Sequence, residues 1–191
     1  IYLNMNPPFL LVPNDAGITA PGFRTLIHVL NQLGEVVVVA PDSPQSGMGH
    51  AITISDTLYS KKEKIDDGPQ VEFSISGTPA DCVKFAIREI LDRKPDLCVS
   101  GINHGANSSI NVIYSGTMSA AVEAGIEGIR SIGFSLLDYS WNADFKPCES
   151  IIEKICLSVL SQRKENLILN VKYYQLLLIH LQLVSLFPHL L

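Results

Sequence analysis

An uninterrupted run of apolar residues constrains the fold of this chain most strongly. In the stretch EVVVVA, Glu35 to Ala40, every residue after the first is apolar. A strand with one face in water alternates apolar and polar residues, whereas a strand of a parallel sheet is covered on both faces and is apolar throughout. The run therefore predicts a central strand of a parallel sheet with helices on both sides.

Strand and helix patterns alternate along the rest of the chain. The predicted strands are Phe9–Val12, Glu35–Ala40, Gln70–Ser76, Pro95–Gly101, Ser131–Leu136 and Asn166–Val171. The predicted helices are Pro21 to about Gly34, Thr78–Leu91 with Thr78 as N-cap, Thr117 to about Gly125, and Pro147–Gln162. This alternation predicts an α/β fold with a doubly wound, mostly parallel sheet.

The segment between the second and third predicted strands has a different character. His50–Ile54 and Thr57–Ser60 alternate, and we expect them to form a short pair. The charged run that follows, Lys61–Pro69, is expected to be a solvated hairpin turn.

Composition narrows the functional class. A chain of 191 residues is long enough for one domain with a real core. The net charge of −5 argues against a protein that binds nucleic-acid polymers through their phosphates. The four cysteines form no CxxC pair, and the first residues lack a basic secretory n-region, so we expect a cytoplasmic protein.

The last residues are unusual. Tyr173 to Leu191 contains no Lys, Arg, Asp or Glu. Glutamine, histidine and proline interrupt the segment, so we expect a buried or poorly defined segment rather than a membrane helix, and no membrane partner.

Polar residues gather after three of the predicted strands. Asp15 follows the first strand, Ser46 follows the second, and Asn103 follows Pro95–Gly101. Loops at the carboxyl ends of parallel strands converge on one edge of the sheet. Each residue alone is explained as a turn or capping residue, but together they offer the hard oxygen ligands that Mg²⁺, Mn²⁺ or Ca²⁺ prefer.

A helix start lies beside these loops. Tyr114 to Thr117, YSGT, leads into the small-residue helix, and the backbone N–H groups of Ser115, Gly116 and Thr117 are expected to point at an anion. A metal next to a phosphate-binding helix start suits the hydrolysis of phosphate esters.

Other interpretations fit less well. The first loop lacks GxGxxG, which argues against a dinucleotide enzyme, and SGMGH is not the GxSxG elbow of a serine hydrolase. His50 and His104 are interpreted as surface polar residues, because no partner is evident in the sequence.

Five loop segments carry a family resemblance. They are NDAGITAPG, VVVVAPDSPQSGMGHAIT, GTPADCV, PDLCVSGINHGAN and IYSGTMSAAVEA. In this order and spacing, the chain resembles the SurE-like survival protein nucleotidases, metal-dependent phosphatases that act on nucleoside monophosphates. The resemblance covers about Phe9 to Val171 and is specific because five motifs agree.

The resemblance implies a Rossmann-like, three-layer fold and a nucleotidase that hydrolyses nucleoside 5′- or 3′-monophosphates. It implies one divalent cation per subunit, Mg²⁺ or Mn²⁺ with Ca²⁺ as a further candidate, and assembly into homodimers or tetramers. Carried over by motif, the metal ligands are Asp15, Ser46 and Asn103, and Asp15 is also the catalytic residue. The substrate-binding residues are Asn107, Ser115, Gly116 and Thr117.

Two departures from the family pattern matter. The family motif NDDG reads NDAG here, so Ala16 replaces the second metal-binding acid. The alternative is therefore a catalytically impaired homologue that binds nucleotide or phosphate without turnover. The resemblance also stops near Val171, which predicts a C-terminally truncated fold with one domain, 1–171, and a non-matching apolar tail, 172–191.

Overall fold

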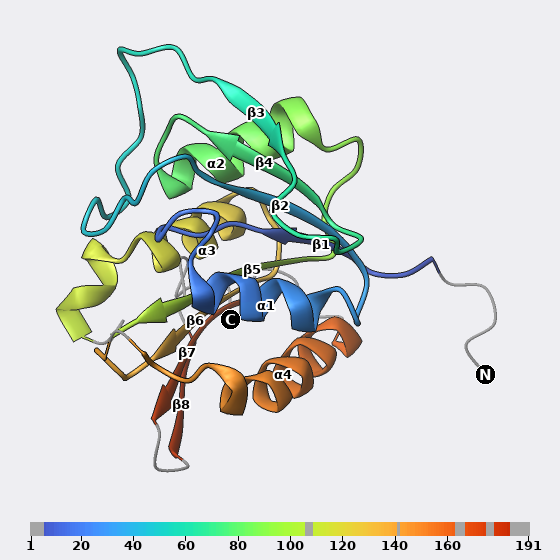
Figure 1. The fold of residues 1–191 in the computed structure, drawn as a ribbon, viewed down its shortest axis with the longest axis vertical. Helices are drawn as coiled ribbons and strands as arrows, with labels where there is room; N and C mark the ends of the chain where they lie inside the picture. The colour runs from blue at the N-terminus through green and yellow to red at the C-terminus, as the bar shows by residue number, and fades with distance from the viewer. Residues whose placement is uncertain (1–5, 106–108, 141, 163–166, 175–177, 184–191) are drawn as a thin grey trace.

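The protein forms one eight-stranded sheet in the order β3-β4-β2-β1-β5-β6-β7-β8, as seen in a computed structural model (Figure 1). The structure describes residues 6–105, 109–140, 142–162, 167–174 and 178–183. The strands are β1 (Phe9–Val12), β2 (Glu35–Pro41), β3 (Ser60–Glu63), β4 (Val71–Ile75), β5 (Leu97–His104), β6 (Ser131–Leu136), β7 (Ile168–Tyr174) and β8 (Leu178–Leu183). Only the outermost pairs, β3 with β4 and β7 with β8, are antiparallel.

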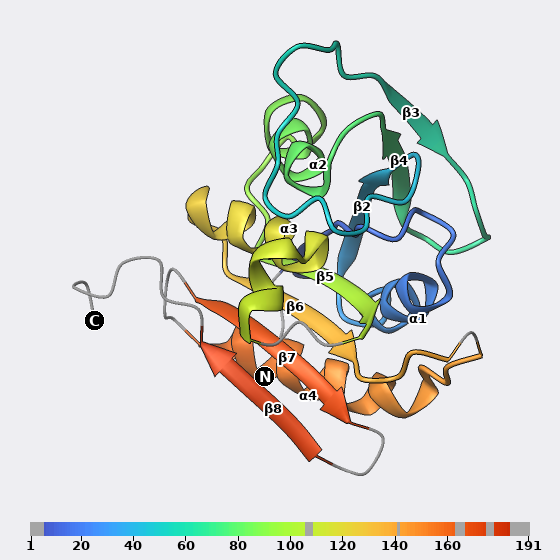
Figure 2. The ribbon, with the colours of Figure 1, turned by 90° about the vertical axis from the view of Figure 1, so that its left-hand side faces the viewer.

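Helices cover both faces of this sheet. They are α1 (Pro21–Leu30), α2 (Pro79–Phe85), the π-helical turn η1 (Ala86–Ile90), the 3₁₀ turns η2 (Ser109–Tyr114) and η3 (Lys146–Cys148), α3 (Gly116–Ile126) and α4 (Glu149–Ser161). α1 and α4 lie on one face of the sheet, and α2 and α3 lie on the other (Figures 1 and 2). Buried residues of each pair of helices contribute to a separate core with the sheet. The predicted three-layer, doubly wound α/β fold is confirmed.

The valine run occupies the expected place. β2 lies between β1 and β4 and runs parallel to both. Val38 contributes to the core shared with α1, whereas Val39 contributes to the core shared with α2, and both are fully buried. Because successive side chains point to opposite faces, each valine is needed to fill one of two cores.

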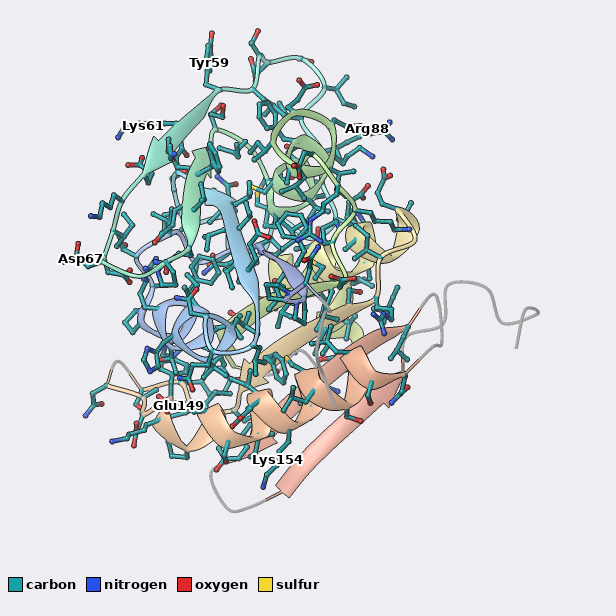
Figure 3. All side chains as sticks on the ribbon, turned by 90° about the vertical axis from the view of Figure 1, so that its right-hand side faces the viewer. Tyr59, Lys61, Asp67, Arg88, Glu149 and Lys154 are labelled. Atoms are coloured by element: carbon teal, nitrogen blue, oxygen red, sulfur yellow. The ribbon has the colours of Figure 1, made fainter. Side chains whose placement is uncertain are left out.

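The outer strand next to β4 is not the predicted one. His50–Ile54 contains no strand, so its predicted pairing with Thr57–Ser60 is wrong. Instead, β3 pairs with β4 and includes the first residues of the charged run that was predicted to be only a turn. Tyr59, Lys61 and Asp67 lie at this outer edge (Figure 3), where charged side chains protect an edge strand from further pairing.

The capping box of α2 explains why residues 51–53 form no strand. The Thr78 hydroxyl accepts from the Asp81 N–H at 3.1 Å and donates to the Ala51 carbonyl at 2.7 Å. The Asp81 carboxylate accepts from the backbone N–H of Thr53 at 3.1 Å and from its hydroxyl at 2.6 Å. The predicted cap at Thr78 is confirmed, and its partners use the backbone groups that a strand would have needed.

The second half of the sheet ends in a hairpin. β7 extends past Val171 to Tyr174 and pairs with β8, with Val171 opposite Leu181. The predicted boundary between residues 171 and 172 therefore falls inside a strand. Part of the segment that was predicted to be buried or poorly defined is a strand as well. Among the residues that the structure describes, no helix is both long and apolar enough to cross a membrane.

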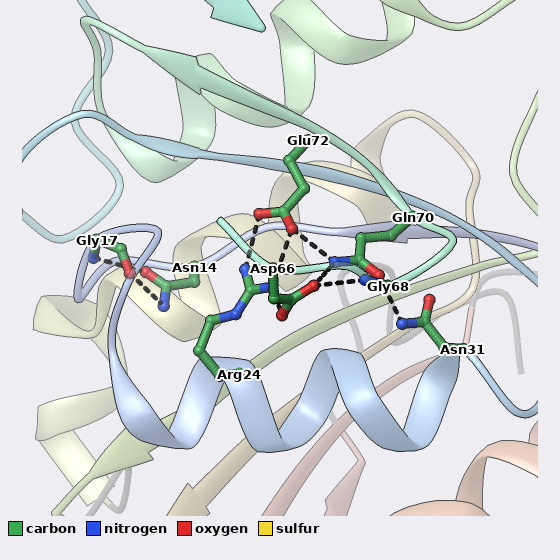
Figure 4. A network of polar contacts seen from close by, with 8 residues as sticks. All are labelled: Asn14, Gly17, Arg24, Asn31, Asp66, Gly68, Gln70 and Glu72. Atoms are coloured by element: carbon green, nitrogen blue, oxygen red, sulfur yellow. Dashed lines mark hydrogen bonds and ion pairs between the residues drawn. The ribbon is translucent and has the colours of Figure 1, made fainter. Parts of the chain in front are cut away.

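A charged network ties α1 to the turn before β4 (Figure 4). Arg24 contacts both carboxylate oxygens of Glu72, at 2.7 and 2.9 Å, and also pairs with Asp66. Gln70 donates to both carboxylates at 2.6 Å and accepts from Asn31 at 2.7 Å. Because Glu72 is only 2% exposed, the Arg24 guanidinium supplies the charge that its burial requires.

Candidate functional site

A hollow of about 240 Å³ lies at the carboxyl ends of β1, β2 and β5. Three predicted metal ligands line it: Asp15 after β1, Ser46 after β2, and Asn103 near the end of β5. Ser115, from the predicted substrate-binding set, lines the same hollow. Residues that are far apart in the sequence therefore meet at the edge of the sheet where open α/β folds bind ligands.

Asp15 is the buried acid of this hollow. It is 5% exposed, and its Oδ1 accepts from the Thr117 hydroxyl at 2.8 Å. The backbone N–H of Thr117 also donates to the carboxylate. Burial raises the pKa of Asp15 above its usual value, and the hydrogen bonds from Thr117 offset only part of this effect.

Gly116 allows the start of α3 to approach Asp15. A Cβ at position 116 would lie 2.5 Å from the Cβ of Asp15 and 2.9 Å from its Oδ2. No side chain fits at this distance without displacing the acid. The positive end of the α3 dipole therefore lies directly against the Asp15 carboxylate and favours its ionised form.

Contrary to the prediction from the sequence, the backbone N–H groups at the start of α3 do not all point at an anion site. The N–H of Ser115 donates to the Val112 carbonyl at 3.3 Å, and the N–H of Thr117 serves Asp15. The Ser115 hydroxyl caps α3 by accepting from the Met118 N–H at 3.1 Å. The structure therefore does not direct all three N–H groups at an incoming anion. Substrate binding by Ser115, Gly116 and Thr117 stays a prediction.

The loop that carries Ser46 is fixed at several points. The N–H of Gln45 donates to the Asp15 carbonyl at 2.8 Å, and the N–H of Gly49 donates to the Tyr114 carbonyl at 3.2 Å. Gly49 has a φ of +57°, and a Cβ there would lie 2.6 Å from a backbone oxygen. Glycine is therefore required where this loop passes the turn before α3.

His50 has a partner that the sequence did not reveal. Its Nε2 lies 2.6 Å from Glu123 Oε2, and Lys84 Nζ lies 2.9 Å from Glu123 Oε1. Glu123 is 4% exposed within α3. The hydrogen bond with His50, followed by that with Lys84, lowers the pKa of Glu123. His50 is thus not an unpartnered surface residue but links the Ser46 loop to α3.

One signal for this pair was present in the sequence. Glu123 is the only charged residue within Gly116–Ile126, a helix of small and apolar residues. A buried acid among such residues requires a cation or a donor. The sequence could not identify His50 as that partner, because the two residues lie 73 positions apart.

The donor set determines what the hollow could hold. Asp15, Ser46 and Asn103 all offer oxygen, which fits Mg²⁺, Mn²⁺ or Ca²⁺ in kind. In the described ranges, no Lys, Arg or His forms an ion pair with Asp15. A bound cation would therefore compensate the buried negative charge of Asp15.

The same site lacks a second acid. Ala16 is half-buried beside Asp15, and no group of three or more His, Cys, Asp or Glu that could hold a metal occurs among the described residues. Asn107, another predicted substrate-binding residue, lies outside the described residues.

Comparisons with known proteins agree with this architecture. The family model described as survival protein SurE matches residues 10–179. A crystal structure of the SurE protein from Aquifex aeolicus superposes with a TM-score of 0.76 at 42% identity, over 87% of this chain and 66% of that one.

Curated relatives carry the name 5′-nucleotidase SurE. The one from Christiangramia forsetii is 69% identical over 159 residues, which are 83% of this chain and 61% of the relative. The one from Flavobacterium johnsoniae is 64% identical over 170 residues, 88% of this chain and 66% of the relative. This chain thus spans slightly less than two thirds of the length of either relative. From the family match and these identities, the chain belongs to the SurE family.

Proposed function

We propose that this chain is a divalent-metal-dependent nucleotidase that hydrolyses nucleoside 5′- or 3′-monophosphates to nucleoside and phosphate. The observation that carries the proposal is Asp15, a buried carboxylate with no cationic partner among the described residues, in one hollow with Ser46 and Asn103. Relatives named 5′-nucleotidase SurE support the hydrolysis of 5′-monophosphates.

Asp15, Ser46 and Asn103 would hold one cation, Mg²⁺ or Mn²⁺ with Ca²⁺ as a further candidate. When bound, such a cation polarises a phosphoryl oxygen and lowers the pKa of nearby water. Thr117 holds the Asp15 carboxylate by two hydrogen bonds, so the acid is oriented before any ligand arrives. The start of α3 favours the ionised acid, which is the form that binds cations.

The phosphate group would lie in the hollow, next to this carboxylate and the start of α3. Asn107, Ser115, Gly116 and Thr117 are the proposed substrate-binding residues. Support comes from the position of Ser115 on the wall of the hollow and from the first turn of α3, whose dipole attracts anions. Ser115 and Thr117 act mainly by fixing the helix start and Asp15, since their N–H groups already have acceptors within the chain.

Ala16 supports one alternative. With one carboxylate instead of two, the site carries less negative charge for a divalent cation. The alternative is a homologue that binds nucleotide or phosphate but turns it over slowly or not at all.

We infer a cytoplasmic location and assembly into homodimers or tetramers as part of the same proposal. All four cysteines are buried free thiols, which fits a reducing compartment. Assembly follows from membership of the family alone.

Phosphate release from AMP tests the proposal, measured with Mn²⁺, Mg²⁺, Ca²⁺ or EDTA. The proposal predicts release that requires a cation and is lost in Asp15→Asn. Asp67→Asn, at a 98% exposed carboxylate, is the matched control and should behave like the unchanged chain. Release that persists in EDTA or in Asp15→Asn would overturn the metal-dependent assignment.

A further inference from the structure

A second hollow adjoins the candidate metal site. It has a volume of about 360 Å³, and His104 lines both hollows. Its other walls are Pro21 at the start of α1 and Tyr139 and Ser140 in the segment after β6. The predicted site residues come from loops after β1, β2 and β5, so this wall extends the candidate site to a fourth loop.

The imidazole of His104 is held in place although the residue is exposed. Its ring contacts the Phe145 ring edge-to-face, with centroids 4.9 Å apart and an angle of 80° between the ring planes. Phe145 is itself 5% exposed and belongs to the core beneath α1 and α4. The buried ring therefore fixes a wall that both hollows share.

The Tyr139 ring lies directly on the backbone after β5. A Cβ at Gly105 would lie 2.7 Å from a carbon of this ring, and Gly105 has a φ of +93°. Glycine thus permits both the turn and the close approach of the ring. Tyr139 is 76% exposed, so the ring presents an aromatic surface to solvent beside the candidate site.

We propose that this second hollow receives the base of a nucleoside monophosphate, with the base stacking on Tyr139 while the phosphate occupies the first hollow. The proposal rests on the proposed function and adds the part of the substrate that is recognised. Pro21, His104 and Tyr139 offer ring surfaces, and the Ser140 hydroxyl offers a polar group to the edge of a base. Bases of every kind stack on aromatic rings, so the hollow favours nucleotides over aliphatic phosphate esters without selecting one base.

The test compares AMP with ribose 5-phosphate, which has the same phosphate and sugar but no base. We expect the unchanged chain to prefer AMP by about tenfold in kcat/KM, which corresponds to about 1.4 kcal/mol. Tyr139→Ala should reduce this preference severalfold, mainly through KM for AMP, and Tyr139→Phe should retain it. Tyr59→Ala removes an equally accessible ring, 70% exposed at the β3 edge, and is the matched control (Figure 3).

Binding of adenosine separates this proposal from the nucleotidase function. Measured by calorimetry, adenosine should bind to the unchanged chain and to Tyr59→Ala, and at least tenfold more weakly to Tyr139→Ala. This result would support the base site even if no ester were hydrolysed. Two results would overturn the base site while leaving phosphatase activity intact. One is an equal kcat/KM for AMP and ribose 5-phosphate in the unchanged chain. The other is adenosine binding that is as strong in Tyr139→Ala as in the unchanged chain.

Discussion

The Thr117 hydroxyl donates a hydrogen bond of 2.8 Å to Oδ1 of Asp15, which lies 102 residues earlier in the chain. This bond joins the loop after β1 to the first turn of α3, next to the candidate metal hollow. Both residues are buried, so water does not replace the bond when it is lost. The orientation of the proposed catalytic acid therefore depends on a residue that would otherwise be taken for an ordinary helix-start threonine.

Thr117→Val tests this dependence, because valine keeps the shape and removes the hydroxyl. A hydrogen bond to a charged group contributes about 1.5–3 kcal/mol, so we expect at least about tenfold lower kcat/KM for phosphate release. The pKa of Asp15 should rise further, because the hydrogen bond from the Thr117 hydroxyl is one of the interactions that lower it. Thr117→Ser keeps the hydroxyl and should retain most of the activity. Equal losses in the two variants would show that packing, not the hydrogen bond, matters at this position.

The Glu123 pair with His50 and Lys84 should make stability depend on pH. Since folding lowers the pKa of Glu123, its contribution is present above the ordinary glutamate pKa and is lost as the pH falls through the lowered value. Glu123→Gln should lower the free energy of unfolding by about 1–2 kcal/mol at neutral pH, allowing for the partial exposure of both partners. Urea unfolding at several pH values should show this difference shrinking below pH of about 4.

Glu127→Gln is the matched control for that experiment. Glu127 pairs with Arg88 at 3.4 Å on the surface next to the end of α3, and the Arg88 side chain is 69% exposed. An exposed pair of this kind contributes about 0–1 kcal/mol. If Glu127→Gln lowers the free energy of unfolding as much as Glu123→Gln does, the burial of Glu123 is not what makes its ion pairs stabilising.

Arg24→Met should destabilise the fold by about 3 kcal/mol, because it leaves Glu72 buried without its cation. The double variant Arg24→Met/Glu72→Met removes both charges and should recover much of the loss, as measured by urea unfolding. Arg88→Met at the exposed pair should have little effect. A double variant that is less stable than Arg24→Met would contradict a charge-burial origin for the loss.

The fold was largely predictable because its strands and helices are specified locally. The valines make both faces of β2 apolar, as a central parallel strand requires. Thr78 and Pro79 mark the start of α2. The position of β3 was not predictable in this way, because it depends on pairing with β4 rather than on the hairpin pattern of His50–Ile54.

The candidate site was predictable only in part. Asp15, Ser46 and Asn103 line one hollow because carboxyl ends of parallel strands meet at one edge of the sheet. The link between His50 and Glu123 depends on contacts between residues distant in sequence. The position of Tyr139 beside the site depends on the close approach of its ring to Gly105, and no local sequence pattern predicts this contact.

The most direct test of the account measures phosphate release from AMP against Mn²⁺ concentration, for this chain and for Ala16→Asp. We expect both to be active only with the cation, and Ala16→Asp to reach half-saturation at about tenfold lower Mn²⁺, because a second carboxylate adds charge to the site. This result would mean that Asp15, Ser46 and Asn103 are sufficient for a working but weaker metal site. Activity in Ala16→Asp with none in this chain at any Mn²⁺ concentration would contradict the account and favour the impaired, nucleotide-binding homologue.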